Sequence, residues 1–272
     1  MNQDPEVCSC PPDAVRPLRG DRRLVAVFAH PDDESVVGGL LAKYAAQGVD
    51  TALVVLTRGE NGVHAESTLP PGDELATARA VELREACALL GIRTLVPLAF
   101  PDGLREFEQF RAQEPRADML ERTRAIREVL EPLLRTLDPT HVITFGPEGW
   151  SGHIDHRICS AVTTEIVQQM VGVRLFYVAI PTSAPVQAQG EPALEAAFAH
   201  NHCVQQPYLT HVIDLGDYVD VQIRAMLCHV SQFPDHQATL ELATARYITL
   251  LGRKCYLREA LPVAPERGDL FD

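Results

Sequence analysis

The chain has 272 residues, of which 46% are hydrophobic and 22% are charged, and its formal net charge is −13. This length is sufficient for one large α/β domain, or two small ones, with a full-sized buried core. The negative charge argues against nucleic acid or an anionic membrane as the main partner, because binding to phosphates requires clustered lysine and arginine.

The first 20 residues contain several prolines and no periodic pattern, which predicts a poorly ordered arm over 1–20 and a single domain over 21–272. They lack the basic start and apolar segment of a secretory signal, and no later stretch approaches the roughly 20 apolar residues of a membrane span. We therefore expect a cytoplasmic protein without an integral membrane segment. The arm holds Cys8 and Cys10, whose role the sequence leaves open, and the seven scattered cysteines do not suggest a disulfide framework.

Apolar runs alternate with amphipathic segments along the chain, which is typical of an α/β fold. Strands are expected at 23–29, 50–57, 93–99, 141–145, 175–180 and 211–215. Helices are expected at 34–47, 73–90, 117–137, 154–171, 217–231 and 236–251. Strand–helix–strand units at this spacing are right-handed βαβ units. We predict a single three-layer, Rossmann-like α/β domain with a mostly parallel sheet of five to six strands.

Residues 24–34, LVAVFAHPDDE, join an apolar run to four ionisable side chains in five positions. The apolar run predicts a buried strand of a parallel sheet. Ionisable groups at its end are costly unless they are solvated, paired or bound to a metal. A polar turn that caps the next helix would explain one aspartate but not His-Pro-Asp-Asp-Glu together. Because ligands bind beyond the carboxyl ends of such strands, this turn is the expected place for a site.

A second cluster, His153, Asp155 and His156, follows the strand expected at 141–145. Both clusters should face the crevice at the carboxyl edge of the sheet. Two imidazoles and one carboxylate, with the fourth position open to water, are the usual ligands of a catalytic zinc. Such a site lowers the pKa of bound water and polarises a carbonyl group. The remaining carboxylate and imidazole can transfer protons and stabilise an oxyanion, so the set suits amide hydrolysis.

The residues alone leave the ligand set open. Asp32 and Asp33 are adjacent and point in different directions, so only one of them is expected to reach the metal. A site formed by His30, His153 and His156 is an alternative, because histidines three positions apart share one face of a helix.

The motifs HPDDE at 30–34 and GHIDH at 152–156 resemble those of the LmbE/PIG-L family of zinc-dependent de-N-acetylases. These enzymes remove acetyl groups from N-acetylglucosaminyl compounds. Three shorter motifs, TRGE at 57–60, PDG at 101–103 and HVSQ at 229–232, also fall in family order. The resemblance covers about 24–235, most of the chain.

Carried over position by position, the resemblance implies three metal ligands, a general base, and a histidine that stabilises the tetrahedral intermediate and protonates the amine. In this chain the implied metal ligands are His30, Asp33 and His156. The implied general base is Asp32, and the implied histidine that protonates the amine is His153.

The resemblance also implies that Asp155 is the partner of His153. A carboxylate beside this ring would hold its orientation and favour its protonated form. Arg79 and Asp102 fall near positions that contact the sugar in relatives. The aromatic residue often found before the second motif is here Trp150, followed by Ser151 and Gly152. This departure leaves the identity of the substrate open.

Four further polar residues have expected roles outside the metal site or no expected role. Glu34 is expected to support the first helical turn or to accept a hydrogen bond from a ligand histidine. His229 and Gln232 are as consistent with packing as with a site contact. His64 lies in a long polar loop and is expected to be an exposed bystander.

These inferences together predict a metal-dependent hydrolase that removes an N-acetyl group from an N-acetylglucosamine-type sugar or its conjugate. Zn²⁺ is the expected cofactor, and Fe²⁺ is the alternative for a nitrogen and oxygen ligand set. One competing interpretation is an amidase of the same family that acts on a thiol conjugate or an acylated antibiotic and differs in loops 58–72 and 181–210. Another is a non-catalytic sugar- or metal-binding protein. The sequence leaves open whether the chain forms a homo-oligomer.

Overall fold

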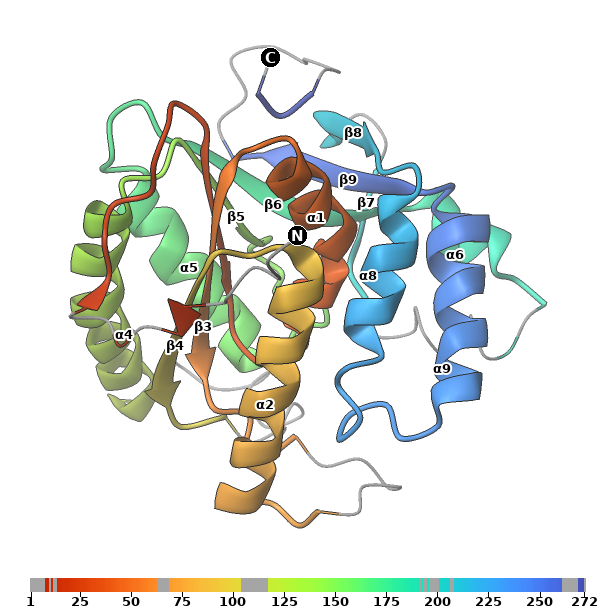
Figure 1. The fold of residues 1–272 in the computed structure, drawn as a ribbon, viewed down its shortest axis with the longest axis horizontal. Coiled ribbons are helices and arrows are strands. Elements are labelled where there is room, and N and C mark those ends of the chain that lie inside the picture. Colours follow the sequence, from red (N-terminus) through yellow and green to blue (C-terminus); the bar gives the residue numbers. More distant parts are fainter. Residues whose placement is uncertain are drawn as a thin grey trace, which may run out of the picture.

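The computed structural model describes residues 8–9, 11, 14–62, 69–103, 117–190, 192, 195, 201–205, 208–260 and 269–271. Over these residues the strands form a nine-stranded sheet at the centre of the molecule (Figure 1). Five parallel strands form its middle: β2 (Arg23–Phe28), β3 (Asp50–Thr57), β4 (Thr94–Phe100), β5 (His141–Phe145) and β6 (Arg174–Pro181). Each lies within a residue or two of the predicted strand, which confirms the α/β class and the mostly parallel sheet.

The strand order β4-β3-β2-β5-β6 reverses direction between β2 and β5. Such a reversal leaves a crevice beyond the carboxyl ends of the two central strands, where open α/β sheets bind their ligands. β2 leads into the HPDDE turn and β5 leads into the loop before the second cluster. The topology therefore positions the two predicted clusters on either side of one crevice.

The edges of the sheet contain the strand predicted at 211–215, which is β8, and further strands that the sequence did not predict. β9 (Lys254–Glu259) pairs antiparallel with β6, and β8 (His211–Asp214) pairs antiparallel with β9. Two short strands, β1 (Cys8–Ser9) and β7 (Cys203–Val204), add to β4 and β6. The predicted number of five to six strands was therefore too low, because β9 mixes charged and apolar residues and β1 and β7 are too short to form a pattern.

Helices cover both faces of the sheet and give the predicted three layers (Figure 1). On one face α1 (Gly38–Ala46), α2 (Asp73–Leu90) and α8 (Tyr218–Met226) pack against one another. On the other face α4 (Ala117–Leu137) packs against α5 (Ile154–Val167). Right-handed crossovers that start on opposite sides of the switch point require this division of the helices. Two shorter helices, α6 (Ser183–Gln187) and α9 (His236–Ala243), lie near the antiparallel edge.

The predicted helix over 34–47 is interrupted. A 3₁₀ turn, Asp33–Val36, comes first, and α1 begins only at Gly38. The interruption lies at Val37, whose backbone, with φ of −125° and ψ of 13°, is not helical. The last predicted helix is also divided, since α9 continues into a π-helical segment, Thr244–Leu250.

Helices α1 and α8 approach each other closely at Gly38 and Gly39. A Cβ atom on Gly39 would lie 2.8 Å from Oε1 of Gln222 and 3.1 Å from the carbonyl oxygen of Tyr218. Gln222 bridges the two elements, because its Oε1 accepts from the N–H of Gly39 at 3.0 Å and its Nε2 donates to the carbonyl of Ser35 at 2.8 Å. Helix α8 is thereby fixed against the turn that follows β2.

Part of the predicted N-terminal arm packs on the domain. Val15 and Leu18 are buried in the main core, and the N–H of Leu18 donates to the carbonyl of Leu137 at 3.1 Å. The cysteines that the structure describes with their side chains are free thiols: Cys87, Cys159, Cys203, Cys228 and Cys255. In the described part of the chain, no helix combines the length and the apolar character needed to cross a membrane.

Candidate active site

Three side chains converge where the crevice lies between β2 and β5. Nδ1 of His30 lies 3.1 Å from Nε2 of His156 and 3.4 Å from Oδ2 of Asp33. Oδ1 of Asp33 in turn lies 3.3 Å from Nε2 of His156. The two histidines are 126 residues apart in the sequence, so the sheet topology alone brings them together. We call these three residues the ligand triad.

The hydrogen bonds of the two imidazoles direct lone pairs into the triad. Nδ1 of His156 lies 3.0 Å from the carbonyl of Gly149, and because a carbonyl only accepts, this nitrogen carries the ring hydrogen. Nε2 of His30 lies 3.1 Å from Oδ1 of Asp102 and 3.2 Å from Oδ2 of Asp155, which also only accept when ionised. Both remaining ring nitrogens therefore face the carboxylate of Asp33.

Three lone-pair donors at this spacing fit a divalent metal. Ligands at about 2.0–2.1 Å from a tetrahedral zinc lie about 3.3 Å from one another, close to the separations in the triad. Burial opposes ionisation of Asp33, but His156 and His30 outweigh it and hold the pKa of Asp33 well below its usual range. Burial lowers the pKa of His30, but hydrogen bonds that its ring donates to Asp102, Asp155 and Asp33 raise it well above its usual value. The site thus favours positive charge at its centre.

Asp32 stands next to the triad without joining it. Nη2 of Arg79 lies 3.1 Å from Oδ2 of Asp32, and 22% of the Asp32 side chain is exposed. Burial raises the pKa of Asp32 to about 6 although the charge of Arg79 lowers it. A carboxylate with such a pKa is suited to accept a proton near neutral pH.

His153 caps the N-terminus of α5 and lies beside the triad. Its Nδ1 accepts from the N–H of Asp155 at 3.2 Å, which places the ring hydrogen of a neutral His153 on Nε2. The ring stands edge-on to that of His30, with centroids 4.8 Å apart. Burial and the neighbouring rings of His30 and His156 lower the pKa of His153 to about 4. This lowered pKa disfavours the protonated form that the sequence led us to expect.

Comparison with known proteins places this site in a family. Residues 25–167, just over half of the chain, match the family model described as PIG-L, GlcNAc-PI de-N-acetylase. The chain belongs to the PIG-L family. A relative in Saccharopolyspora erythraea, 1D-myo-inositol 2-acetamido-2-deoxy-alpha-D-glucopyranoside deacetylase 1, is 30% identical over 79% of this chain and 79% of its own length.

Solved structures share the fold of this PIG-L chain at lower identity. N,N'-diacetylchitobiose deacetylase from Pyrococcus horikoshii matches with a TM-score of 0.58 and 22% identity, over 88% of this chain and 83% of that one. The 4-carboxy-2-hydroxymuconate hydratase of Pseudomonas putida matches with a TM-score of 0.56 and 17% identity, over 91% of this chain and 100% of that one. Because a deacetylase and a hydratase share it, the fold alone does not determine the reaction.

Two of the site residues transferred from PIG-L relatives have partners that differ from the prediction. The carboxylate of Asp155 faces His30, and it also accepts from the N–H of Gly103 at 2.7 Å and pairs with Nη2 of Arg122 at 2.8 Å. Asp102, predicted to contact the sugar, is buried, and its Oδ2 accepts from the N–H of Asn61 at 3.1 Å. Both carboxylates therefore orient the ring of His30.

Arg79 also has an environment that differs from the predicted sugar contact. The residue is 2% exposed. Besides Asp32, its guanidinium donates to the carbonyl of Gly59 at 2.9 Å and to the carbonyl of Pro31. Arg79 thus stabilises the HPDDE turn, because its hydrogen bonds join that turn to the loop after β3.

Two contacts at the PIG-L site, Arg122 with Asp155 and Glu34 with His229, were not predicted from the sequence. Arg122 gave no signal, since it is one of several arginines on an amphipathic helix whose contact with Asp155 depends on packing. Glu34 pairs with His229, Oε1 to Nε2 at 2.6 Å, rather than with a ligand histidine, and both side chains are fully buried. The HVSQ motif was the signal for His229. His64 lies outside the described residues.

The loop before α5 holds Trp150 in a left-handed conformation with φ of 58°. The guanidinium of Arg246, from the π-helical segment, lies 5.8 Å from the centre of its indole ring. The carbonyl of Trp150 accepts from the N–H of His202 at 2.8 Å. The same loop supplies the Gly149 carbonyl that orients His156. Trp150 is therefore part of the segment that shapes the site.

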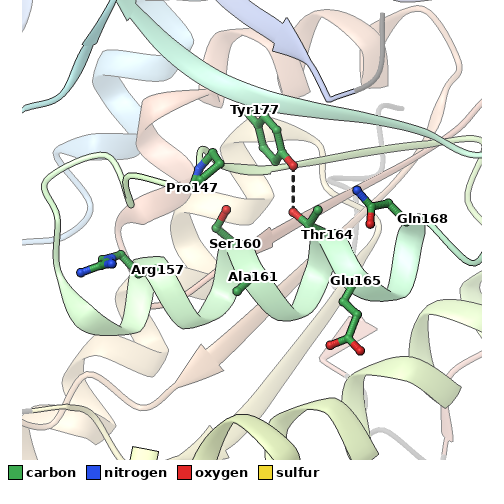
Figure 2. A pocket seen from close by; sticks show the side chains of 8 residues that line it. All are labelled: Pro147, Arg157, Ser160, Ala161, Thr164, Glu165, Gln168 and Tyr177. Carbon is green, nitrogen blue, oxygen red and sulfur yellow. Dashed lines mark hydrogen bonds between the residues drawn. The ribbon is translucent and has the colours of Figure 1, made fainter. Parts of the chain in front are cut away.

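A hollow of about 300 Å³ lies along α5 and contains none of the triad residues in its lining (Figure 2). Residues of α5 line it together with Pro147 and Tyr177, whose hydroxyl lies 2.9 Å from Oγ1 of Thr164. None of the residues that line it has a predicted role in the site.

Proposed function

We propose that this PIG-L chain is a metal-dependent hydrolase that removes the acetyl group from an N-acetylglucosamine-type amino sugar or its conjugate. One observation carries the proposal: three lone-pair donors lie at the spacing of metal ligands, and beside them Asp32 remains outside the triad. The family membership and the deacetylase relative support the same reaction.

His30, Asp33 and His156 are the proposed ligands of a zinc ion, with Fe²⁺ as the alternative metal. A metal held there polarises an amide carbonyl and lowers the pKa of a bound water. Asp102 and Asp155 serve the metal indirectly, because their hydrogen bonds to Nε2 of His30 fix the tautomer that presents Nδ1.

Asp32 is the proposed general base. It accepts a proton as water adds to the amide carbonyl, and it returns that proton to the departing amine. The neutral ring of His153 donates its Nε2–H to the developing oxyanion. Its lowered pKa disfavours an extra proton on the ring, so Asp32 is the proposed source of the proton that the amine gains. Water and amide yield acetate and a protonated amine, and the base is regenerated.

Two alternatives use the same residues differently. An amidase of this family for a thiol conjugate or an acylated antibiotic would share the triad and Asp32 and differ in loops 58–72 and 181–210. A non-catalytic sugar- or metal-binding protein would have no use for Asp32, whose backbone lies in the strained left-handed region. This observation favours catalysis over binding alone.

The test combines metal analysis with acetate release from a panel of N-acetylated sugars, N-acetylglucosamine among them. Asp32→Asn should keep the metal and lose roughly 10²–10⁴-fold in kcat, the usual range for loss of a general base. The matched control is Asp138→Asn, because Asp138 also has a positive φ, of 51°, but pairs with Arg23 far from the triad. Full activity in Asp32→Asn, or a metal-loaded wild type that releases no acetate from any sugar, would contradict the proposal.

A further inference from the structure

The backbone of Asp32 is held in an unfavourable conformation. Its φ of 111° lies in the region that side-chain-bearing residues rarely adopt. Such a conformation costs free energy and persists only where neighbouring groups hold it in place. The neighbours of Asp32 therefore determine where its carboxylate points.

Glu34 is one of the groups that hold this backbone. Its Oε2 accepts from the N–H of Asp32 at 3.0 Å, and its Oε1 lies 2.6 Å from Nε2 of His229. Glu34 and His229 are both fully buried. The carboxylate thus joins the N–H of Asp32 to a histidine 195 residues from Glu34 in sequence.

His229 is itself fixed by the segment after α8. Its carbonyl accepts from the N–H groups of Gln232 and Phe233, each at 2.9 Å. The next residue but one, Ser231, is bound to Glu82 of α2 through its N–H at 2.8 Å and its hydroxyl at 2.7 Å. These hydrogen bonds hold the segment that carries His229 in place beside Glu34.

Burying the ionisable pair of Glu34 and His229 costs free energy that an apolar pair would not cost. Among the described residues, Nδ1 of His229 has no hydrogen-bond partner, so the one polar contact that its ring makes there is with Glu34. Buried ionisable pairs can often be replaced by apolar residues without loss of stability. A role in packing alone would not require a histidine at this position.

We propose that His229 is a positioning residue for the general base, acting through Glu34 to hold Asp32 in its left-handed conformation and outside the ligand triad. The proposal rests on the function proposed above, because it assigns His229 to the same reaction. Among the described residues the ring of His229 makes its polar contact with Glu34, so its effect reaches the reaction through the N–H of Asp32.

The test compares His229→Leu, His229→Gln and the control Gln222→Leu. Gln222 joins α8 to the same turn at Ser35 and Gly39 but makes no contact with Asp32, so its replacement measures the structural cost alone. We expect His229→Leu to lose about 10- to 100-fold in kcat for acetate release, with KM and metal content unchanged, since small misplacements of a catalytic group cost about that much. His229→Gln should recover most of this loss, because its amide can donate to Glu34. Gln222→Leu should lower the melting temperature and reduce kcat much less than His229→Leu does.

Crystal structures of the wild type and the variants provide a second measurement that needs no substrate. Asp32 should leave the left-handed region in His229→Leu and stay there in His229→Gln. Glu34→Met covers the case in which His229→Leu does not fold, because it removes the acceptor for the N–H of Asp32 and should show the same changes.

Wild-type kcat in His229→Leu, equal losses of kcat in His229→Leu and Gln222→Leu, or an unchanged φ at Asp32 would overturn the positioning role. A wild type that releases no acetate would contradict the proposed function instead. The crystal structures then decide the role of His229 without the assay.

Discussion

At the scale of single residues, the charged groups around His30 matter as much as the ligand triad. Nε2 of His30 lies between the carboxylates of Asp102 and Asp155, and Arg122 neutralises the second of these. Partners of this kind fix the tautomer of a metal-binding histidine. The family resemblance assigned Asp155 to His153, two positions before it in the chain, and the fold also brings its carboxylate to a histidine 125 residues away.

Asp155→Asn should therefore weaken metal binding. An amide accepts more weakly than a carboxylate and leaves Arg122 without its counter-charge, so His30 becomes a poorer ligand. The expected loss of metal affinity is about 10- to 100-fold, as is usual for such partners, measured by competition with a chelator. Glu131→Gln is the control, since Glu131 pairs with Arg135 on the exposed side of α4. Unchanged affinity in Asp155→Asn would show that Asp102 alone orients the ring.

At the scale of elements, the seam between α1 and α8 holds the HPDDE turn in place. The two helices meet at Gly38 and Gly39, and Gln222 joins them to Ser35. The close approach requires glycine because larger side chains would push α8, and with it the segment that carries His229, away from the turn.

Gly39→Ala should destabilise the protein although alanine favours helices. The added Cβ would lie 3.1 Å from a backbone carbonyl, that of Tyr218, which cannot easily move. Overpacking of this kind costs about 1–3 kcal/mol. Gly38→Ala is the matched comparison, because its nearest neighbour is a side-chain atom of Leu90 at 3.2 Å that can adjust. Urea unfolding of both variants should show the larger loss for Gly39→Ala, and equal losses would contradict this explanation.

At the scale of the whole molecule, stability should depend on pH through a histidine far from the site. His141 begins β5, and burial together with the charge of Arg174 lowers its pKa to about 4, from an ordinary value of about 6.5. The unfolded chain binds this proton more readily than the folded one. His141 therefore adds stability above about pH 6.5, and this contribution is lost as the pH falls towards 4.

The variant His141→Gln should lose stability less steeply than the wild type between pH 6.5 and 4. The difference in slope should approach about 1.4 kcal/mol per pH unit, the value for one proton. Urea unfolding at several pH values measures it, with His236→Gln, at an exposed position, as the control. Parallel curves for the wild type and His141→Gln would contradict the lowered pKa.

The sequence was sufficient to predict the fold class, the five central strands and the residues that meet in the crevice. These features depend on local patterns, namely apolar runs and short polar motifs at strand ends. The rest depends on the direction in which side chains point after packing. The burial of Arg79 beneath Asp32, the contact of Arg122 with Asp155 and the neutral state of His153 all arise from neighbours that no spacing indicates. The edge strand β9 escaped prediction because its charged residues hide its alternation.

Trp150 is the only tryptophan in the chain and lies three positions before His153, in the loop that also supplies the Gly149 carbonyl to His156. Its emission is therefore free of contributions from other indoles. A change in the position of His156 should move the loop that carries Trp150 and so alter the surroundings of its indole ring. The guanidinium of Arg246 lies close to the face of that ring. Trp150 is thus an intrinsic fluorophore in the loop that orients His156, and we expect its emission to report the binding of a metal or a sugar without a label.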